Sequence, residues 1–267
     1  MTTIACWKSE DGGGRATLNL ASDSRFRDGS GKSWDLGRKL FFSAEHADVF
    51  GFVGEALPPQ TVLGQLVEAI DSSSLGPRSA DPSQRLTNYK SHLDATIGTF
   101  PKTSSVEVLF ATRDDRSTSK PFRMWSILFS PGAVHGTPTV VPIAASGSGL
   151  IGAFGSGARN FRTTYTTVRA KPQGTTSRAV YWAFMDHLAS NIDAHTGGPP
   201  QLVRLGDKGP AMPVGVSYGG KRYLLGFELD SAQLAETRVN EWHDELYQFI
   251  DPVTGKRRSN AQKIARP

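Results

Sequence analysis

Apolar residues along the chain follow two spacings, which separate the predicted strands from the predicted helices. A glycine-rich turn at 9–14 joins two short stretches of apolar residues, which predicts an N-terminal hairpin. Further strands are predicted where short apolar runs lie between turn residues. The predicted strands cover 3–8, 15–20, 39–42, 49–54, 106–112, 122–129, 137–144 and a stretch from Leu202 onward that includes 223–227.

Helices are predicted where apolar residues recur every three or four positions. Pro58 and Pro59 suit the first turn of a helix that continues through Val62, Leu66 and Ile70. The other predicted helices run through Leu86, Leu93 and Ile97, over 177–192, and over 232–250.

The order of these elements indicates an α+β fold. Strands come first, then two helices, then strands and then helices again, without the regular alternation of a parallel sheet. This order fits a four-layer αββα sandwich, in which two sheets are covered by helices on both outer faces. We expect one domain over 1–230, a helical extension over 231–254 and a basic tail over 255–267.

Composition narrows the class of protein. The 267 residues are 38% hydrophobic, and a chain of this length can bury a core without disulfides. The single cysteine, Cys6, excludes an intramolecular disulfide framework and a cysteine-rich zinc site. The sequence lacks an apolar run of about 18 residues, which a membrane span needs, and it lacks the apolar stretch of a secretion signal. We therefore expect a soluble cytoplasmic protein without a membrane partner.

The basic character of the chain is confined to its C-terminal end. The formal net charge is +5. Residues 255–267 contain no acidic residue, so residues 1–254 are formally neutral; the basic residues of this tail are Lys256, Arg257, Arg258, Lys263 and Arg266. A basic groove for nucleic acid has no support, and we expect no nucleic-acid partner. The tail could bind an acidic partner or an unfoldase.

Several familiar motifs for cofactors and catalysis do not fit this sequence. Residues 147–152 match G-x-G-x-x-G, but further glycines follow up to Gly157 and 166–176 contain no acidic residue, which argues against a dinucleotide site. The six histidines show no metal-ligand spacing, and the G-x-S-x-G motif of hydrolases does not occur. We expect neither a metal nor a cofactor.

The N-terminus carries a candidate nucleophile. Removal of Met1, which is common before a small residue, would leave Thr2 with a free α-amine. Such an amine has a pKa of about 7.7–8.0, so part of it is unprotonated near neutral pH and can accept the hydroxyl proton. Many chains begin with Met-Thr, so this feature needs support from elsewhere in the sequence.

Motifs further along the chain give that support, because in their order they resemble the proteasome β-subunit family, and most of all the bacterial peptidase subunits that form simpler rings. In the first half the motifs are Thr2-Thr3-Ile4, Ala21-Ser22-Asp23, Arg38-Lys39 and the Gly-Phe-Val-Gly of 51–54. In the second half, 154–157 is similar to the family's glycine-serine-glycine turn before its third helix, and 192–198 to its aspartate-x-x-serine-glycine-glycine signature. The resemblance covers roughly Thr2 to Val203 and implies the αββα fold of N-terminal nucleophile hydrolases.

The resemblance also implies a role for each matching residue. Thr2 would be the nucleophile, Lys39 would favour deprotonation of its hydroxyl, and Asp23 would keep Lys39 charged and oriented. The backbone N–H of Gly54 would stabilise the oxyanion. Three further residues would form hydrogen bonds to the N-terminal amine and to one another: Ser156, Asp193 and Thr196.

Alignment with the family implies an apolar pocket beside Thr2, although the aromatic residues could also simply be core. The residues of this pocket would be Phe26, Gly37, Phe41, Phe52 and Ala56.

The sequence departs from the family pattern at several points. The glycine turn near Asp11 is longer, and Thr196 stands where serine is usual, which keeps the hydroxyl. Glu55 follows Gly54 where a second glycine is common, which would place a negative charge near the substrate channel. Only Met1 precedes Thr2, so activation would depend on methionine removal rather than on self-cleavage.

The resulting hypothesis is a threonine peptidase that hydrolyses peptides or proteins in a homo-oligomeric ring or partial ring. Two alternatives stay open. The same nucleophile could hydrolyse small amides, or the chain could be a catalytically silent scaffold subunit that retains Met1.

Overall fold

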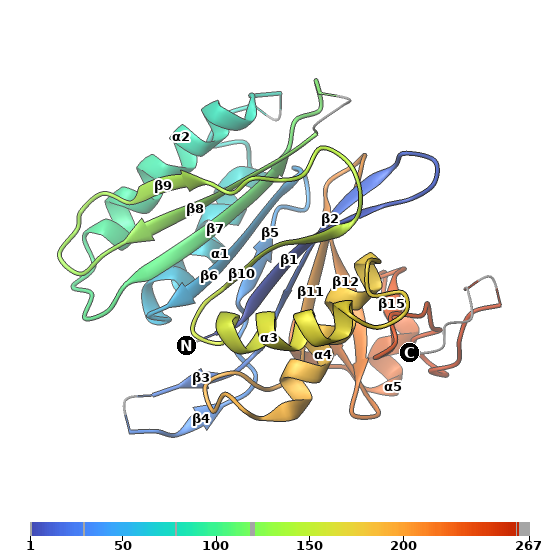
Figure 1. Ribbon diagram of the computed structural model, residues 1–267. Coiled ribbons are helices and arrows are strands. Elements are labelled where there is room, and N and C mark those ends of the chain that lie inside the picture. The colour runs from blue at the N-terminus through green and yellow to red at the C-terminus, as the bar shows by residue number, and fades with distance from the viewer. Residues whose placement is uncertain (1, 29, 78, 118–120, 260, 262–267) are drawn as a thin grey trace.

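Two large, mostly antiparallel sheets form the centre of a mixed α+β structure (Figure 1). The computed structural model describes residues 2–28, 30–77, 79–117, 121–259 and 261. The first sheet has the strand order β10 (Gly149–Phe154), β1 (Ile4–Glu10), β2 (Ala16–Ser22), β11 (Gln201–Leu205), β12 (Ala211–Tyr218), β13 (Lys221–Leu224) and β14 (Phe227–Glu228), and β15 (Trp242–His243) pairs with β12 in parallel. The second has the order β5 (Leu40–Phe42), β6 (Asp48–Gly54), β7 (Val106–Arg113), β8 (Phe122–Phe129) and β9 (Thr137–Val140). A small hairpin joins β3 (Phe26–Arg27) to β4 (Ser33–Trp34).

Five α-helices accompany these sheets within the described residues. Their bounds are α1 (Leu57–Asp71), α2 (Pro82–Leu93), which continues into a π-helical turn (Asp94–Gly98), α3 (Ala158–Arg169), α4 (Ser177–Ser190) and α5 (Ser231–Glu236). Asp81 caps α2, because its side chain accepts hydrogen bonds from the backbone N–H groups of Ser83 and Gln84. None of the helices formed by the described residues combines the length and the apolar composition that a bilayer crossing requires.

The core consists of three large apolar clusters. One lies between the two sheets and contains residues of β1, β2, β5, β6 and β7, such as Cys6 and Leu109. A second lies where α1 and α2 pack against the five-stranded sheet, and it is rich in aromatic residues, such as Phe110. The third lies where α3 and α4 pack against β1 and β10, with Trp7 and Trp182 both fully buried. Figure 1 shows α1 and α2 beside one sheet and α3 and α4 beside the other.

The predicted helix over 232–250 is wrong. Only α5 is helical, and the chain then runs irregularly into β15. The apolar residues that suggested a helix instead face the protein body: Trp242 is fully buried against Gly215, and the Trp182 indole N–H donates to the Leu246 carbonyl. The segment therefore packs on the first sheet and on α4 as irregular chain. Its apolar residues are buried there without forming a helix.

Two other predicted elements end earlier in the structure than expected, and the glycine motif at 147–152 lies mostly in a strand. The strand expected over 137–144 ends at Val140, and the helix expected over 177–192 ends at Ser190, where Asn191 adopts a left-handed backbone. The glycine motif at 147–152 belongs largely to β10, which pairs with β1 and forms no loop before a helix. A dinucleotide fingerprint has these glycines in the turn between a strand and a helix, so this motif has a different structural context.

The beginning of the basic tail folds back on the chain just before it. The backbone N–H of Arg258 donates to the Phe249 carbonyl, and that of Asp251 donates to the Lys256 carbonyl. Lys263 and Arg266, also predicted to belong to the tail, lie outside the described residues. The described part of the tail is thus joined to residues 249–251 by backbone hydrogen bonds.

Candidate active site

A buried ion pair lies at the centre of the predicted site. Asp23 follows the end of β2 and Lys39 precedes β5, and both side chains are completely buried. The Lys39 Nζ lies 2.9 Å from the Asp23 Oδ1. Burial lowers the pKa of Lys39, and the Asp23 carboxylate offsets part of that shift. A charged lysine here depends on its carboxylate partner.

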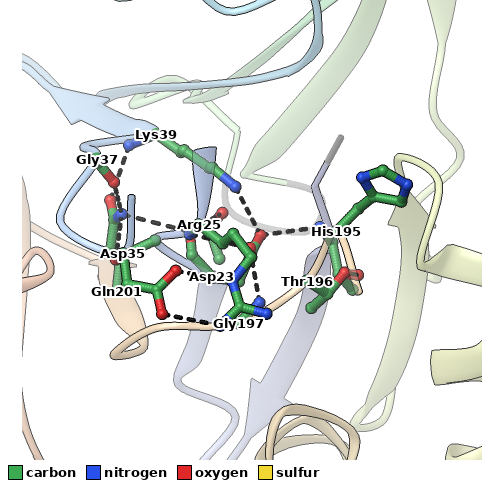
Figure 2. Close-up of polar contacts among 12 residues, drawn as sticks. Asp23, Arg25, Asp35, Gly37, Lys39, His195, Thr196, Gly197 and Gln201 are labelled. Carbon is green, nitrogen blue, oxygen red and sulfur yellow. Dashed lines mark hydrogen bonds and ion pairs between the residues drawn. The ribbon is translucent and has the colours of Figure 1, made fainter. Parts of the chain in front are cut away.

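The Asp23 carboxylate also joins three backbone segments (Figure 2). Its Oδ1, which accepts from Lys39, accepts the Thr3 N–H at 3.0 Å as well. Its Oδ2 accepts the N–H groups of Gly197 at 3.1 Å and of Arg25 at 3.2 Å. These hydrogen bonds hold Thr3, Arg25 and Gly197 around the one carboxylate that also pairs with Lys39.

Gln201, which was not among the predicted site residues, holds the backbone around Lys39 in place. Its buried side-chain oxygen accepts the N–H groups of Lys39 and Leu40, at 2.9 and 3.2 Å. Its amide nitrogen donates to the Gly37 carbonyl and to the Ser24 hydroxyl. A buried amide with these bonds holds the strand that carries the lysine at one position relative to β11.

The glycine-serine-glycine turn at 155–157 lies directly against the N-terminal residues. Thr2 is 2% exposed, and its carbonyl oxygen accepts the N–H of Gly157 at 3.4 Å. A Cβ on Gly155 would lie 2.0 Å from that oxygen and 3.1 Å from a methyl group of Val53, and the Gly155 φ is +87°. Only glycine allows this approach, and Val53 of β6 lies beside the same glycine.

Gly54, the predicted oxyanion donor, ends β6 in a backbone conformation that favours glycine. Its φ is +98°, and a Cβ there would lie 2.0 Å from the Ser105 carbonyl oxygen. The neighbouring Glu55 carboxylate accepts the N–H groups of Thr103 and Ser104 at 3.0 and 3.1 Å. Glu55 therefore fixes the loop before β7 against Gly54, and its charge is balanced by two backbone donors.

A chain of hydrogen bonds connects the signature loop at 193–196 to residue 3. The Thr196 hydroxyl donates to the Asp193 Oδ2 at 2.8 Å, and the Thr3 and Thr196 hydroxyl oxygens are 2.8 Å apart. The Thr3 hydroxyl also lies 3.1 Å from the Nε2 of His187. Burial alone would raise the pKa of Asp193, but hydrogen bonds from the His195 N–H and Thr196 hold it below its usual value.

Ser156 lies apart from this chain of hydrogen bonds. Its side chain is exposed at the tip of the turn, and no hydrogen bond joins it to Asp193 or Thr196 within the described part of the protein. Asp193 and Thr196 thus come together as predicted, whereas Ser156 does not join them. Sequence reasoning missed Thr3 and His187. The available signal for His187 was a histidine among the apolar residues of the helix that became α4.

The five predicted pocket residues lie in one region. Phe41 and Phe52 belong to the buried cluster beneath α1, and half-buried Phe26 and Ala56 pack against it. The Phe26 and Phe52 ring centroids are 6.2 Å apart, and a Cβ on Gly37 would overlap the Phe26 ring. Phe26 is half-buried, whereas Phe41 and Phe52 are almost fully buried. Of the three phenylalanines, Phe26 is thus the one that is partly exposed.

The hairpin that carries Phe26 is anchored by a paired arginine. Arg25 makes two hydrogen bonds to Asp35, at 2.7 and 2.8 Å, and the Lys39 Nζ lies 5.3 Å from the centre of the Phe26 ring. The bond to Asp35 raises the pKa of Arg25 and the same bond lowers that of Asp35, so both stay charged. The β3–β4 hairpin is held next to the ion pair in this way.

Nothing in the described residues groups three or more histidine, cysteine, aspartate or glutamate side chains as a metal site would. The region combines a buried lysine–carboxylate pair with Thr2 and Thr3 and with backbone N–H donors of glycines. Neither the protein-family models nor the curated proteins compared with this chain gave a match.

Proposed function

We propose that this chain is a threonine peptidase of the N-terminal nucleophile type, with the αββα arrangement expected from its resemblance to proteasome β-subunits. The observation that carries the proposal is the shared oxygen of Asp23, which accepts both the Lys39 ammonium and the N–H of residue 3. A fully buried ammonium whose carboxylate partner also accepts the N–H of residue 3 would favour loss of the hydroxyl proton of a neighbouring terminal threonine.

The reaction would begin once Met1 is removed. The α-amine of Thr2 would accept the hydroxyl proton, through a water molecule, while the hydroxyl oxygen attacks the substrate carbonyl carbon. The positive charge of Lys39 would stabilise the oxygen as it loses its proton, and the N–H of Gly54 would stabilise the oxyanion. Losing such an oxyanion donor raises the barrier by about 3 kcal/mol.

The tetrahedral intermediate would then break its bond to the leaving nitrogen, which takes the proton from the α-amine. An ester between the substrate acyl group and Thr2 remains. Water would attack this ester with the same amine as base, which releases the carboxylic acid product and restores the threonine hydroxyl.

The substrate side chain next to the cleaved bond would be apolar. The partly exposed Phe26 ring is packed against Phe52, and Ala56 lies against the same cluster. Because Phe41 and Phe52 are almost fully buried, at 4% and 1% exposure, they would form the floor of the pocket rather than its open wall. A homo-oligomeric ring or partial ring in the cytoplasm remains part of the proposal, and a monomeric mass in solution would contradict the assembly.

Hydrolysis of fluorogenic peptides with apolar, basic or acidic residues before the reporter group tests this function. We expect the apolar substrates to be cleaved and Lys39→Ala to abolish cleavage. Lys32→Ala is the matched control, because Lys32 is an exposed lysine on the β3–β4 hairpin. Full activity of Lys39→Ala would contradict the mechanism. Cleavage of small amides but not of peptides would favour the acylase alternative.

A further inference from the structure

The hydroxyl groups of Thr3 and Thr196 connect His187 to Asp193 through three successive contacts. These are His187 Nε2 to Thr3 Oγ1 at 3.1 Å, Thr3 Oγ1 to Thr196 Oγ1 at 2.8 Å, and Thr196 Oγ1 to Asp193 Oδ2 at 2.8 Å. Each contact needs one proton between its two atoms. Three contacts thus need three protons.

The direction of the chain follows from counting these protons. An ionised carboxylate only accepts, so the Thr196 hydroxyl must give its single proton to Asp193. The contact between the two hydroxyls then has to be filled by the proton of Thr3. The remaining contact can only be filled by a proton on the Nε2 of His187.

The surroundings of His187 agree with this assignment. Its Nδ1 is buried and has no hydrogen-bond partner among the residues that the structure describes, which suits a bare nitrogen better than an N–H group. The ring meets the Phe161 ring of α3 edge to face, at 6.1 Å between centroids. The charged groups that act on it, Asp193 and Asp23, only partly offset the lowering of the His187 pKa by burial.

We infer that His187 is a positioning residue: its Nε2–H begins a one-directional chain of hydrogen bonds that fixes the Thr196 hydroxyl and leaves one of its lone pairs for the amine of Thr2. A threonine oxygen has two lone pairs, and one of them accepts the Thr3 proton. Gly157 has room for no side chain here, because its Cβ would lie 2.0 Å from the Thr3 oxygen and 2.6 Å from that of Thr196. The same glycine donates to the Thr2 carbonyl, which places the turn beside both hydroxyls and residue 2.

This role deepens the proposed function and rests on it. An amine used as a base must direct its lone pair toward the Thr2 hydroxyl, and acceptors that hold its N–H groups set that direction. A Thr196 hydroxyl free to rotate would present its proton to the amine for part of the time. The predicted effect is on the rate of the chemical step and not on substrate binding.

A matched pair of substitutions tests this chain of hydrogen bonds from His187 to Asp193, which we call the relay. Thr3→Val removes the hydroxyl at nearly constant volume, whereas Thr3→Ser keeps it. We expect Thr3→Val to lower kcat about tenfold, the effect of losing the one hydrogen bond that orients the Thr196 hydroxyl, with KM unchanged. Thr3→Ser should stay near the parent rate. His187→Gln, which can still donate, should retain more activity than His187→Leu, which cannot. Equal rates for Thr3→Val and Thr3→Ser in an active protein would overturn the inference.

The tautomer of His187 gives a readout that does not depend on activity. Nitrogen-15 NMR of the full-length protein, with the signal assigned by its loss in His187→Gln, should show a protonated Nε2 and a bare Nδ1 at neutral pH. A proton on Nδ1 would overturn the inference even if the protein is active. An inactive parent protein with the expected tautomer would contradict the proposed function and the catalytic use of the relay, while the direction of the hydrogen bonds would stand.

Discussion

Lys39 and Asp23 form an ion pair in which neither side chain is exposed to solvent, with 2.9 Å between Nζ and Oδ1. Charges in this position need each other, because neither can be stabilised by water. Asp23 has the larger set of partners, since its two oxygens also accept three backbone N–H groups. The pair therefore links the stability of the fold to the geometry of the proposed site.

Removing one partner of this pair should destabilise the protein strongly. We expect Asp23→Asn to lower the free energy of unfolding by about 3–5 kcal/mol, because it leaves the Lys39 ammonium buried without a counter-charge. The double variant Asp23→Asn with Lys39→Met should regain part of that loss. Urea denaturation of the three proteins measures both effects. If the double variant were no more stable than Asp23→Asn, an unpaired buried charge would not be the cause.

Substitutions at two glycines distinguish the effect of the close contact with residue 2 from the effect of backbone strain. Gly155 and Gly147 have similar φ angles, +87° and +83°, but a Cβ would meet the Thr2 carbonyl only at Gly155. Gly147→Ala should lower stability by about 1–3 kcal/mol through strain alone. Gly155→Ala should lower it further and reduce peptidase activity as well. Thermal unfolding and peptide hydrolysis test this, and equal effects of the two substitutions would contradict the close approach.

His187 predicts a loss of stability in mild acid. Burial lowers its pKa in the folded protein below the ordinary value of 6.5. Above about pH 6.5 the ring is neutral in both the folded and the unfolded protein. As the pH falls through that value, the unfolded chain takes up a proton that the folded protein does not, so the free energy of unfolding decreases.

This decrease should be smaller in His187→Gln than in the parent protein, when unfolding is measured by urea at a series of pH values between about 7.5 and 5. His243, whose pKa is also lowered by burial, remains in both proteins and contributes equally. A parent and a variant with parallel pH profiles would show that His187 does not titrate differently on folding.

The C-terminal segment should contribute to the stability of the whole fold. Trp242 is fully buried against Gly215, whereas Trp34 is 54% exposed. Trp242→Ala should lower the free energy of unfolding by about 3–5 kcal/mol, and Trp34→Ala should change it by less than about 0.5 kcal/mol. A small effect of Trp242→Ala on the urea midpoint would show that the segment is a separable extension.

Elements with strong local patterns could be predicted from the sequence. The prolines before Val62 and the long apolar face of α4 identified helices, the glycine-rich turn identified the hairpin of β1 and β2, and alternation supported β2. The helix over 232–250 failed because Trp242 packs against Gly215 and Tyr247 packs against Trp7 and Tyr181, contacts that no local spacing reveals. Helix α3 was not found by periodicity, since Ala158, Phe161 and Val168 are its only buried residues.

Much of the candidate site was accessible only through the family resemblance. The positions of Asp23 and Lys39 in an alignment indicated a pair, and the structure brings them together. Gln201 was missed because its role depends on how β11 of one sheet lies beside the start of β5 in the other sheet. Thr3 and His187 were missed because their contact spans 184 positions along the chain.

Intact mass spectrometry shows whether Thr2 is an active N-terminal nucleophile. The protein is weighed before and after treatment with a peptide epoxyketone, a reagent that needs the hydroxyl and the free amine of one terminal residue, with Thr2→Ala as control. We predict loss of Met1 and one adduct per chain, which the variant does not form. A protein that retains Met1 and forms no adduct would contradict the account.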